Sequence, residues 1–342
     1  MSLQLWRFLQ ARANFTTKEN IVSIDTKKTE RVADKNNKDK YQIKCKVKYI
    51  RLTSTLLFTA IVIIFVTAPT KYMQSFVDGV TIWAYNVLPA LFPFMVLTTL
   101  TLKLQTKRKR SVTKLLFGLN CDSIFLTSLL CGYPVGAKAI ADSNADANAA
   151  TIMCSFCSTA GPIFMIATVG AKLLQSTTAT IILVATQVAS AILNGLIYRT
   201  KTSVHLIDNN AKLSARDIGD TVTNSALSVI SVGGLIALFY MLTDMIKSVL
   251  PQTVADSLIT SFVIGLFEMT NGIFGVCKLT DVATATVLCS ALLSFGGLCV
   301  FAQCYAFLGA KQVKPLKLFK MKTTQSAIAT ILSYILTKLF LN

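Results

Sequence analysis

The sequence has few charged residues. Only 15% of its 342 residues are Asp, Glu, Lys or Arg, whereas soluble domains carry about 25%. Charge is missing altogether from long stretches such as residues 52–68 and 151–171. A helix needs about 20 residues to cross the hydrocarbon layer of a bilayer. The composition therefore argues against a soluble enzyme and predicts a polytopic membrane protein of the all-α class.

Patterns typical of catalytic or metal sites are also missing. The single histidine, His205, lies in a polar segment, and no Ser-His-Asp set, HExxH or GxxxxGK[ST] motif is present. Most of the nine cysteines lie inside apolar segments, which indicates packing rather than a disulfide framework. Cys154 and Cys157 have a redox or metal spacing but no second Cys or His pair nearby. We expect no enzyme activity, no metal and no cofactor.

Acidic residues are half as frequent as basic ones, 16 against 34, which gives a net charge of +18. In a soluble protein this excess would suggest nucleic acid binding. Here the basic residues lie between apolar segments, as they do in cytoplasmic loops of membrane proteins. Residues 1–49 are polar and basic, so we expect no cleavable signal peptide but a mostly disordered, cytoplasmic tail. The expected partner is the lipid bilayer, not nucleic acid.

Residues 50–342 then form the expected transmembrane domain, with about seven to nine hydrophobic segments. Two of these segments are rich in Gly, Pro or polar residues, which interrupt a helix. Irregular backbone at membrane depth is tolerated only where protein or a wet cavity surrounds it. The segments are 50–68, 83–102, 115–136, 151–173, 178–198, 224–246, 255–276, 281–309 and 323–341, of which 115–136 and 255–276 are the two interrupted ones.

The two halves of this domain resemble each other. Residues 126–132 align with 259–265, and so Gly132 lies opposite Gly265. A second alignment, of 153–155 with 288–290, continues to place Gly161 opposite Gly296. We therefore expect two repeats, about 83–198 and 224–341, each with a helix, an interrupted segment and two further helices. Repeats with interrupted segments in matching positions point to a transporter-type site.

Basic residues also favour one of two topologies. If the interrupted segments cross the membrane fully, the loop 199–221 faces outside. If they are re-entrant hairpins, 199–221 and 311–322 both face the cytoplasm, and the nearly neutral 247–256 faces out. The positive-inside rule prefers the second arrangement. Each repeat then has three crossings, an odd number, and the two repeats insert with opposite orientation.

Ionisable residues within the apolar segments are the first candidates for function, because they are costly in hydrocarbon. The acidic residues in the interior of these segments are Asp122, Asp244 and Glu268. Glu268 is the best of them, and two interpretations of it stay open. It binds a cation, a proton or a polar solute, or it is a strut that pairs with a helix N-terminus or with Lys138.

The interruptions supply the remaining candidates. Pro134 blocks a continuous helix, and flanking glycines permit close backbone approach. Similar helix-breaking residues recur around Gly161 and around Gly296. The expected substrate-binding residues are Gly132, Tyr133, Pro134, Gly136, Lys138, Ser158, Thr159, Gly161, Pro162, Glu268, Thr270, Asn271, Gly272, Gly296, Gly297 and Gln303.

Four motifs follow one another along the chain. They are Gly132-Tyr133-Pro134-x-Gly136-Ala137-Lys138, Phe156-Cys157-x-x-x-Gly161-Pro162-x-Phe164, Glu268-Met269-Thr270-x-Gly272, and Ser294-Phe295-Gly296-Gly297 with Gln303. This ordered set resembles the sporulation integral membrane proteins of endospore-forming bacteria, which carry the nucleoside-recognition, or Gate, domain. The resemblance covers about residues 52–340. Where the family commonly has Asn after its Phe-Cys pair, this chain has Ser158 and Thr159.

The resemblance implies a multi-pass protein of the bacterial inner membrane, related to concentrative nucleoside transporters with inverted repeats and re-entrant hairpins. It does not identify the solute. We expect a sporulation-associated protein that transports or recognises a small polar solute, nucleoside-like compounds being one class, with a proton or cation as coupling partner. The alternative is a non-transporting scaffold or assembly factor for spore formation, and the sequence does not indicate an oligomeric state.

Overall fold

A computed structural model describes residue 49 and residues 51–104, 111–199 and 214–341. Their regular structure is helical, and no strand occurs in these ranges. The chain divides into two compact units, residues 1–68 and 69–342. In the first unit Arg51–Thr67 form a helix, while the expected tail lies almost wholly outside the described residues. The all-helical prediction is confirmed for the described part of the chain.

The second unit contains the expected site. Its elements in chain order are α2 (Pro69–Ile82), the π-helical η1 (Trp83–Val87), α3 (Leu88–Lys103), α4 (Val112–Phe117), α5 (Asp122–Cys131), α6 (Val135–Asp142), α7 (Ala147–Met153), the π-helical η2 (Phe164–Leu174), α8 (Thr177–Ile197), α9 (Ala215–Ser248), α10 (Gln252–Ala255), α11 (Leu258–Phe267), α12 (Met269–Leu279), α13 (Val282–Phe295), α14 (Gly297–Leu308), the 3-10 turn η3 (Gly309–Lys311) and α15 (Pro315–Phe340).

Three helices of the described residues are long and apolar enough to cross a membrane: α8, α9 and the run of α13, α14 and η3. The number becomes four if the helix over Arg51–Thr67 and the helical run Pro69–Val87 count together as one span. These lengths and compositions are those of a membrane protein.

Side-chain polarity is arranged as lipid exposure would require. On α8, Ile181 and Ile197 are about 60% exposed, while Gln187 and Asn194 are buried. On α15, Ile331 is likewise exposed and polar residues are buried. A helix in water would turn its amides outward, because burying them without partners is costly. The outer faces therefore suit hydrocarbon rather than water.

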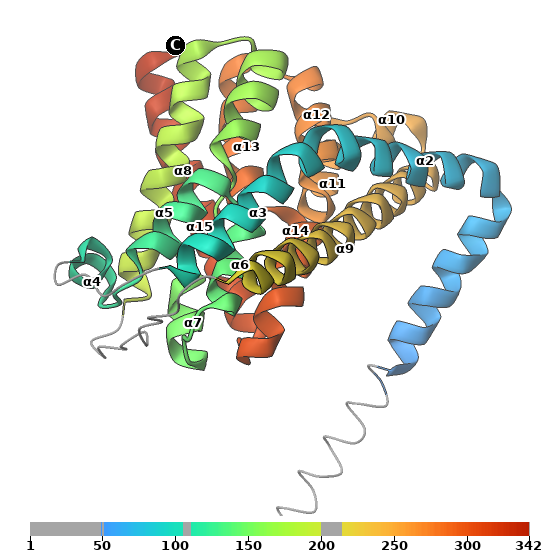
Figure 1. The fold of residues 1–342 in the computed structure, drawn as a ribbon. Helices are drawn as coiled ribbons and strands as arrows, with labels where there is room; N and C mark the ends of the chain where they lie inside the picture. The colour runs from blue at the N-terminus through green and yellow to red at the C-terminus, as the bar shows by residue number, and fades with distance from the viewer. Residues whose placement is uncertain (1–48, 50, 105–110, 200–213, 342) are drawn as a thin grey trace, which may run out of the picture. The chain divides into compact units, whose positions relative to one another are not determined.

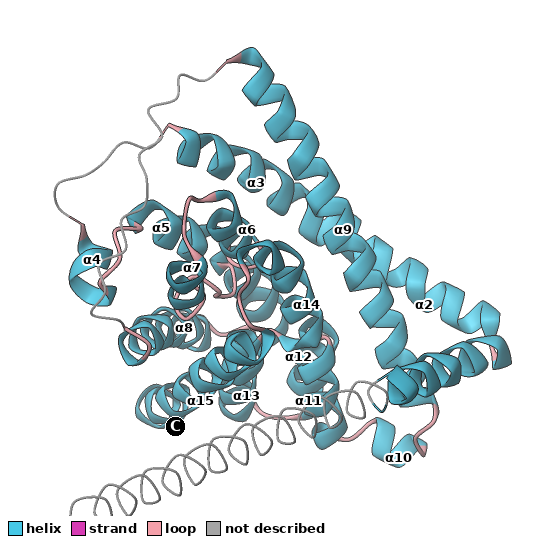
Figure 2. Cartoon of the chain, turned by 90° about the horizontal axis from the view of Figure 1, so that it is seen from below, coloured by secondary structure: helices cyan, strands magenta, loops and turns pink. Residues whose placement is uncertain are grey.

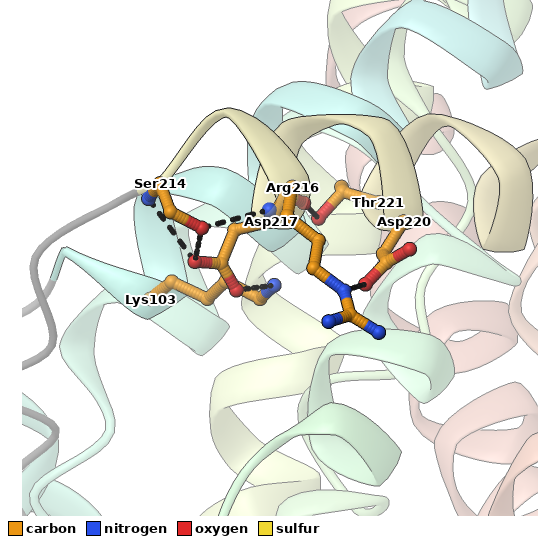
Figure 3. Close-up of polar contacts among 6 residues, drawn as sticks. All are labelled: Lys103, Ser214, Arg216, Asp217, Asp220 and Thr221. Carbon is orange, nitrogen blue, oxygen red and sulfur yellow. Dashed lines mark hydrogen bonds and ion pairs between the residues drawn. The ribbon is translucent and has the colours of Figure 1, made fainter.

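A long helix, α9, lies beside α2 and α3 along one side of the unit (Figure 2). It begins with a capping box, in which Ser214 and Asp217 each accept a hydrogen bond from the other residue's backbone N–H. The Asp217 carboxylate also pairs with Lys103 at the end of α3, 3.1 Å away (Figure 3). The other end of α9 is tied to α2, where Ser75 donates to Asp244 at 2.6 Å.

On the other side, α8, α13 and α15 run side by side (Figure 1). Polar contacts cross their interfaces. The Asn194 amide donates to Ser155 O and to Met321 O. Ser326 donates to Ala291 O at 2.8 Å. The first half of the chain, through α8, thus packs against two helices of the second half, which also contact each other.

Two pairs of short helices form hairpins, α5 with α6 and α11 with α12. In the second hairpin Gly265 and Gly272 lie so close that a side chain on Gly272 would overlap the backbone of Gly265. In the first, a side chain on Gly136 would overlap Ser128 and Cys157 O. Glycine at these crossings permits the helices to touch, as small residues do in membrane helix packing.

Several boundaries differ from those expected. α15 begins at Pro315 rather than near 323, and α9 at Ala215 rather than near 224. Residues 69–82, expected to link two segments, form α2. In each case charged or hydroxyl residues continue a helix beyond its apolar part, because helix formation does not require hydrophobicity. Residues 200–213 of the expected loop 199–221 lie outside the described residues.

Candidate functional site

The first hairpin ends in a tip formed by residues 132–134, called here the first tip. It packs against residues 154–161, the non-helical first break between α7 and η2. The Tyr133 N–H donates to Thr159 O at 2.7 Å, and the Thr159 hydroxyl donates to Ser128 O at 3.1 Å. Gly132 has φ +75° and lies against the backbone of Gly161. One backbone N–H of the tip and one backbone carbonyl of the break therefore satisfy each other.

The second tip is Glu268, which separates α11 from α12. It lies near the second break, which consists of Gly296, between α13 and α14, and Gly297, the first residue of α14. These glycines have φ of +83° and +75°, a conformation that other residues rarely adopt. A Cβ on Gly297 would lie 3.0 Å from Gly265 O. In both halves of the chain, then, a hairpin tip meets a break in a neighbouring helix.

Tyr133 joins the two halves at this point. Its hydroxyl lies 2.7 Å from Met269 Sδ and 3.2 Å from Leu293 O. Its ring lies beside Gly296, where a Cβ would be 3.6 Å away. Residues of the first tip, the second tip and the second break thus meet around one aromatic side chain.

A cavity of about 160 Å³ lies at this meeting point. Its wall is mostly apolar, with a few polar groups, as is usual for small-molecule sites. Six of the expected site residues line it. They are Tyr133, Pro134, Gly161, Glu268, Thr270 and Gln303.

Glu268 is 4% exposed and caps the N-terminus of α12. Its carboxylate accepts from the backbone N–H of Asn271 at 2.7 Å and of Thr270 at 3.1 Å. A carboxylate at a helix N-terminus is favoured by the free N–H groups and the helix dipole. The interpretation of Glu268 as a structural strut named two partners. The helix N-terminus is confirmed as its partner, whereas Lys138 is not, because Lys138 pairs with Asp142 at 2.8 Å. Glu268 also lines the cavity, so both of its expected roles retain a geometric basis.

The other expected residues surround the cavity without being part of its wall. Asn271 faces α9, donating to Thr243 at 3.1 Å and accepting from Lys247 at 3.3 Å. Ser158 lies near Cys304, and Pro162 begins the next helix rather than lying in the break. The residues that hold the tips and breaks together, or pack on them, are Gly132, Gly136, Thr159, Gly272, Gly296 and Gly297.

The two remaining acidic candidates have structural partners. Asp122 is at the start of α5 and accepts from the backbone N–H and the hydroxyl of Thr113, at 2.8 and 2.9 Å. Asp244 accepts from Ser75. Neither lines the cavity.

Lys322 was missed by sequence reasoning, which assigned it to a basic loop. It lies in α15, is 3% exposed, and donates to Ser158 O at 2.5 Å. Its ammonium is 5.3 Å from the centre of the Tyr133 ring, a cation–π distance. Asn86 and Thr168 in the cavity wall were also missed. Nothing in their sequence neighbourhood marks them, because the contacts come from distant segments.

The polar groups of the cavity can both accept and donate hydrogen bonds. Glu268 offers carboxylate oxygens, Thr270 a hydroxyl, and Gln303 an amide whose nitrogen donates to Cys299 Sγ at 3.1 Å. Within the described ranges no three His, Cys, Asp or Glu side chains gather as metal ligands. The arrangement is suited to holding a small molecule in orientation. In comparisons with known proteins, no family model, no curated protein and no solved structure matches this chain.

Proposed function

We propose that this chain is a multi-pass membrane protein that binds a small polar solute in the cavity at Tyr133 and Glu268, and moves or recognises that solute at the membrane. The observation that carries the proposal is the meeting of two hairpin tips and two helix breaks around one cavity with a buried carboxylate in its wall. Broken helices in a membrane are tolerated where they line such a site, and intramembrane carboxylates mark solute or ion pathways.

The cavity's volume limits the solute's size. A cavity of about 150 Å³ holds one benzene molecule, and sites for drug-sized ligands have about 300–1,000 Å³. The observed 160 Å³ accommodates one ring with a few polar substituents. A whole nucleoside fits only after the tips separate. The solute class is therefore a small ring compound with hydrogen-bond donors and acceptors, nucleoside-like compounds remaining one candidate.

Two contacts support the re-entrant topology with inverted repeats. Full crossing by the interrupted segments would put the end of α3 and the start of α9 on opposite sides of the membrane, yet Lys103 and Asp217 lie 3.1 Å apart. Lys311, after α14, donates to Ser143 O at the end of α6. Re-entrant hairpins put all four residues on one side, which the basic loops assign to the cytoplasm.

The order of elements supports the repeat as well. Hairpin α5–α6, broken helix α7–η2 and helix α8 recur as hairpin α11–α12, broken helix α13–α14 and helix α15. The proposed location is the bacterial inner membrane with a cytoplasmic N-terminus, and the resemblance described above adds a role in sporulation.

A thermal-shift screen of the purified full chain tests binding. A ligand specific for the folded form stabilises it by about 2.7 kcal/mol at 100 times its Kd. We expect small ring compounds, including nucleobases and nucleosides, to raise the melting temperature, and Gln303→Leu to reduce that rise. Gln252→Leu, on exposed α10, is the matched control and should leave the rise unchanged.

Uptake of the identified compound into vesicles containing the protein separates transport from recognition. Transport would be established if uptake exceeds the uptake of protein-free vesicles and Gln303→Leu abolishes the difference. A chain that is stabilised by none of the compounds and takes up none would refute the solute proposal and favour the scaffold alternative.

A further inference from the structure

The interior of the α8, α13 and α15 bundle is polar. α8 contributes Gln187, Ser190 and Asn194, which are at most 2% exposed. Ser290 and Ser294 of α13 face them, with the Ser294 hydroxyl donating to Gln187 Oε1 at 2.7 Å. We call these residues, with Lys322 and Gln325 of α15, the polar core. In a bundle that spans hydrocarbon, polar side chains in the interior need partners there.

Contacts between the helices fix the level of Gln325. Asn194 reaches Met321 O, and Ser326 reaches Ala291 O. Gln325 lies between these two points along α15. Gln187 and Asn194 are two helical turns apart on one face of α8, so Gln325 is level with the α8 segment between them.

Several polar atoms of this layer lack protein partners. Both amide atoms of Gln325, which is 1% exposed, and Nε2 of Gln187 make no hydrogen bond to the described residues. Asn194 Oδ1 is also without one. A buried polar group left unpaired destabilises the folded state, so a hydrogen-bond partner from outside the protein is strongly favoured.

Lys322 adds a charge to the same region, one turn of α15 before Gln325. Its ammonium has three N–H donors, and one of them donates to Ser158 O. None of the ion pairs in the described ranges includes Lys322. A buried ammonium without a carboxylate needs further hydrogen-bond acceptors.

The chemistry of the unpaired atoms selects the occupant. The side-chain amide of Asn194 cannot be turned over, because its Nδ2 already donates to two carbonyls. Its Oδ1 therefore needs a hydrogen-bond donor. A simple anion or metal cation cannot donate. The Gln187 amide nitrogen and the ammonium of Lys322 need acceptors. Only an occupant that both donates and accepts satisfies all of them.

We propose that the polar core is a hydration site, in which water molecules bind Gln187, Asn194 and Gln325 and complete the shell of Lys322. A buried water commonly makes about three hydrogen bonds to such groups. The site lies behind the cavity wall, since Leu293, next to Ser294, accepts from Tyr133. Tyr133 thus separates this water from the solute cavity.

A density map of the full chain in lipid nanodiscs, at about 2 Å resolution, tests the proposal directly. We expect water peaks at about 2.7–3.2 Å from Asn194 Oδ1 and from the Gln325 amide. Direct hydrogen bonds among these side chains without intervening peaks would overturn it. So would one larger peak coordinated as an ion or an organic molecule.

Gln325→Met gives a second, independent measurement, because it keeps the side-chain volume and removes the polar atoms. If water satisfies Gln325, the variant loses those bonds and its melting temperature falls by several degrees. If Gln325 is dry and unpaired, the variant melts at or above the wild-type temperature, which would overturn the proposal. Gln252→Met on exposed α10 is the control and should melt like the wild type. The map decides the question even if Gln325→Met does not fold.

Discussion

Replacing Glu268 by Gln is the most informative perturbation of the site, because it removes the charge while preserving shape. In the wild type, two backbone N–H groups donate to the carboxylate at 2.7 and 3.1 Å. An amide has only one acceptor oxygen, so at least one of these buried N–H groups loses its partner. A hydrogen bond to a charged group contributes about 1.5–3 kcal/mol, and the helix-dipole term contributes about 0.3–1 kcal/mol.

The expected loss is therefore about 2–4 kcal/mol in the free energy of unfolding. With about 2–4 °C per kcal/mol for a large domain, Glu268→Gln should melt roughly 5–10 °C below the wild type in detergent. The variant should still insert into the membrane, because the apolar segments are unchanged. Differential scanning fluorimetry of the purified protein measures the shift.

Glu268→Asp separates the strut from the solute contact. Asp is among the best N-cap residues, so the melting temperature should remain near that of the wild type. Its side chain is one methylene shorter and withdraws the carboxylate from the cavity, so stabilisation by the solute should fall. Asp281→Asn, at the cap of α13 and away from the cavity, is a control that should lower the melting temperature slightly and leave the solute response unchanged. If both Glu268 variants melt and respond to the solute like the wild type, the reasoning is refuted, and Glu268 has neither a structural nor a solute-binding role.

Three further predictions concern packing, pH and topology. Gly136→Ala should lower the melting temperature, and not only impair function, because its Cβ would overlap Ser128 and Cys157 O. Gly234→Ala, at a helical position with nothing within 4 Å, should leave the free energy of unfolding unchanged or raise it by about 1 kcal/mol, and equal melting of the two variants would contradict the packing. Asp281 accepts from the Thr284 N–H at 2.9 Å, which lowers the pKa of its carboxyl below the usual range; its stabilisation is present above the unfolded pKa of about 3.9 and is lost as the pH falls through the lower folded value. Asp281→Ala should therefore cost about 0.5–2 kcal/mol at pH 7, with the difference from the wild type vanishing in acid, and a difference that persists at pH 2 would count against this cause. Gln312→Cys, in the turn before α15, should react with membrane-impermeant thiol reagents only from the cytoplasmic side, as should Thr202→Cys; labelling of either from outside would contradict the re-entrant topology.

The sequence located the interruptions well because Gly and Pro act locally. Pro134 ends up in the first tip, and Gly296 with Gly297 form the second break. The second tip was less predictable. The alignment of the halves did not assign it to a residue: Gly265 lies opposite Gly132, whereas the second tip is Glu268, whose carboxylate caps the next helix. Capping chemistry rather than glycine sets that boundary.

The role of Lys322 could not be read from the sequence, because its partner Ser158 O is freed by a break 164 residues away in the chain. A lysine near an apolar segment ordinarily marks the segment's end. The polar face of α8, in contrast, is recognisable from the sequence. Gln187, Ser190 and Asn194 recur at helical spacing, which predicts one polar stripe in an otherwise apolar helix, although the stripe alone does not say what faces it.

The packing of α8 against α13 and α15 has a consequence for biosynthesis. The ribosome completes α8 long before the two helices that cover Gln187 and Asn194, and chains are made at about 5–20 residues per second. For several seconds, therefore, the stripe of amides has no permanent partner in the membrane. A chain that stops before α13 should therefore leave Gln187 and Asn194 without the helices that cover them, and α8 should be less stable in the membrane than in the full chain.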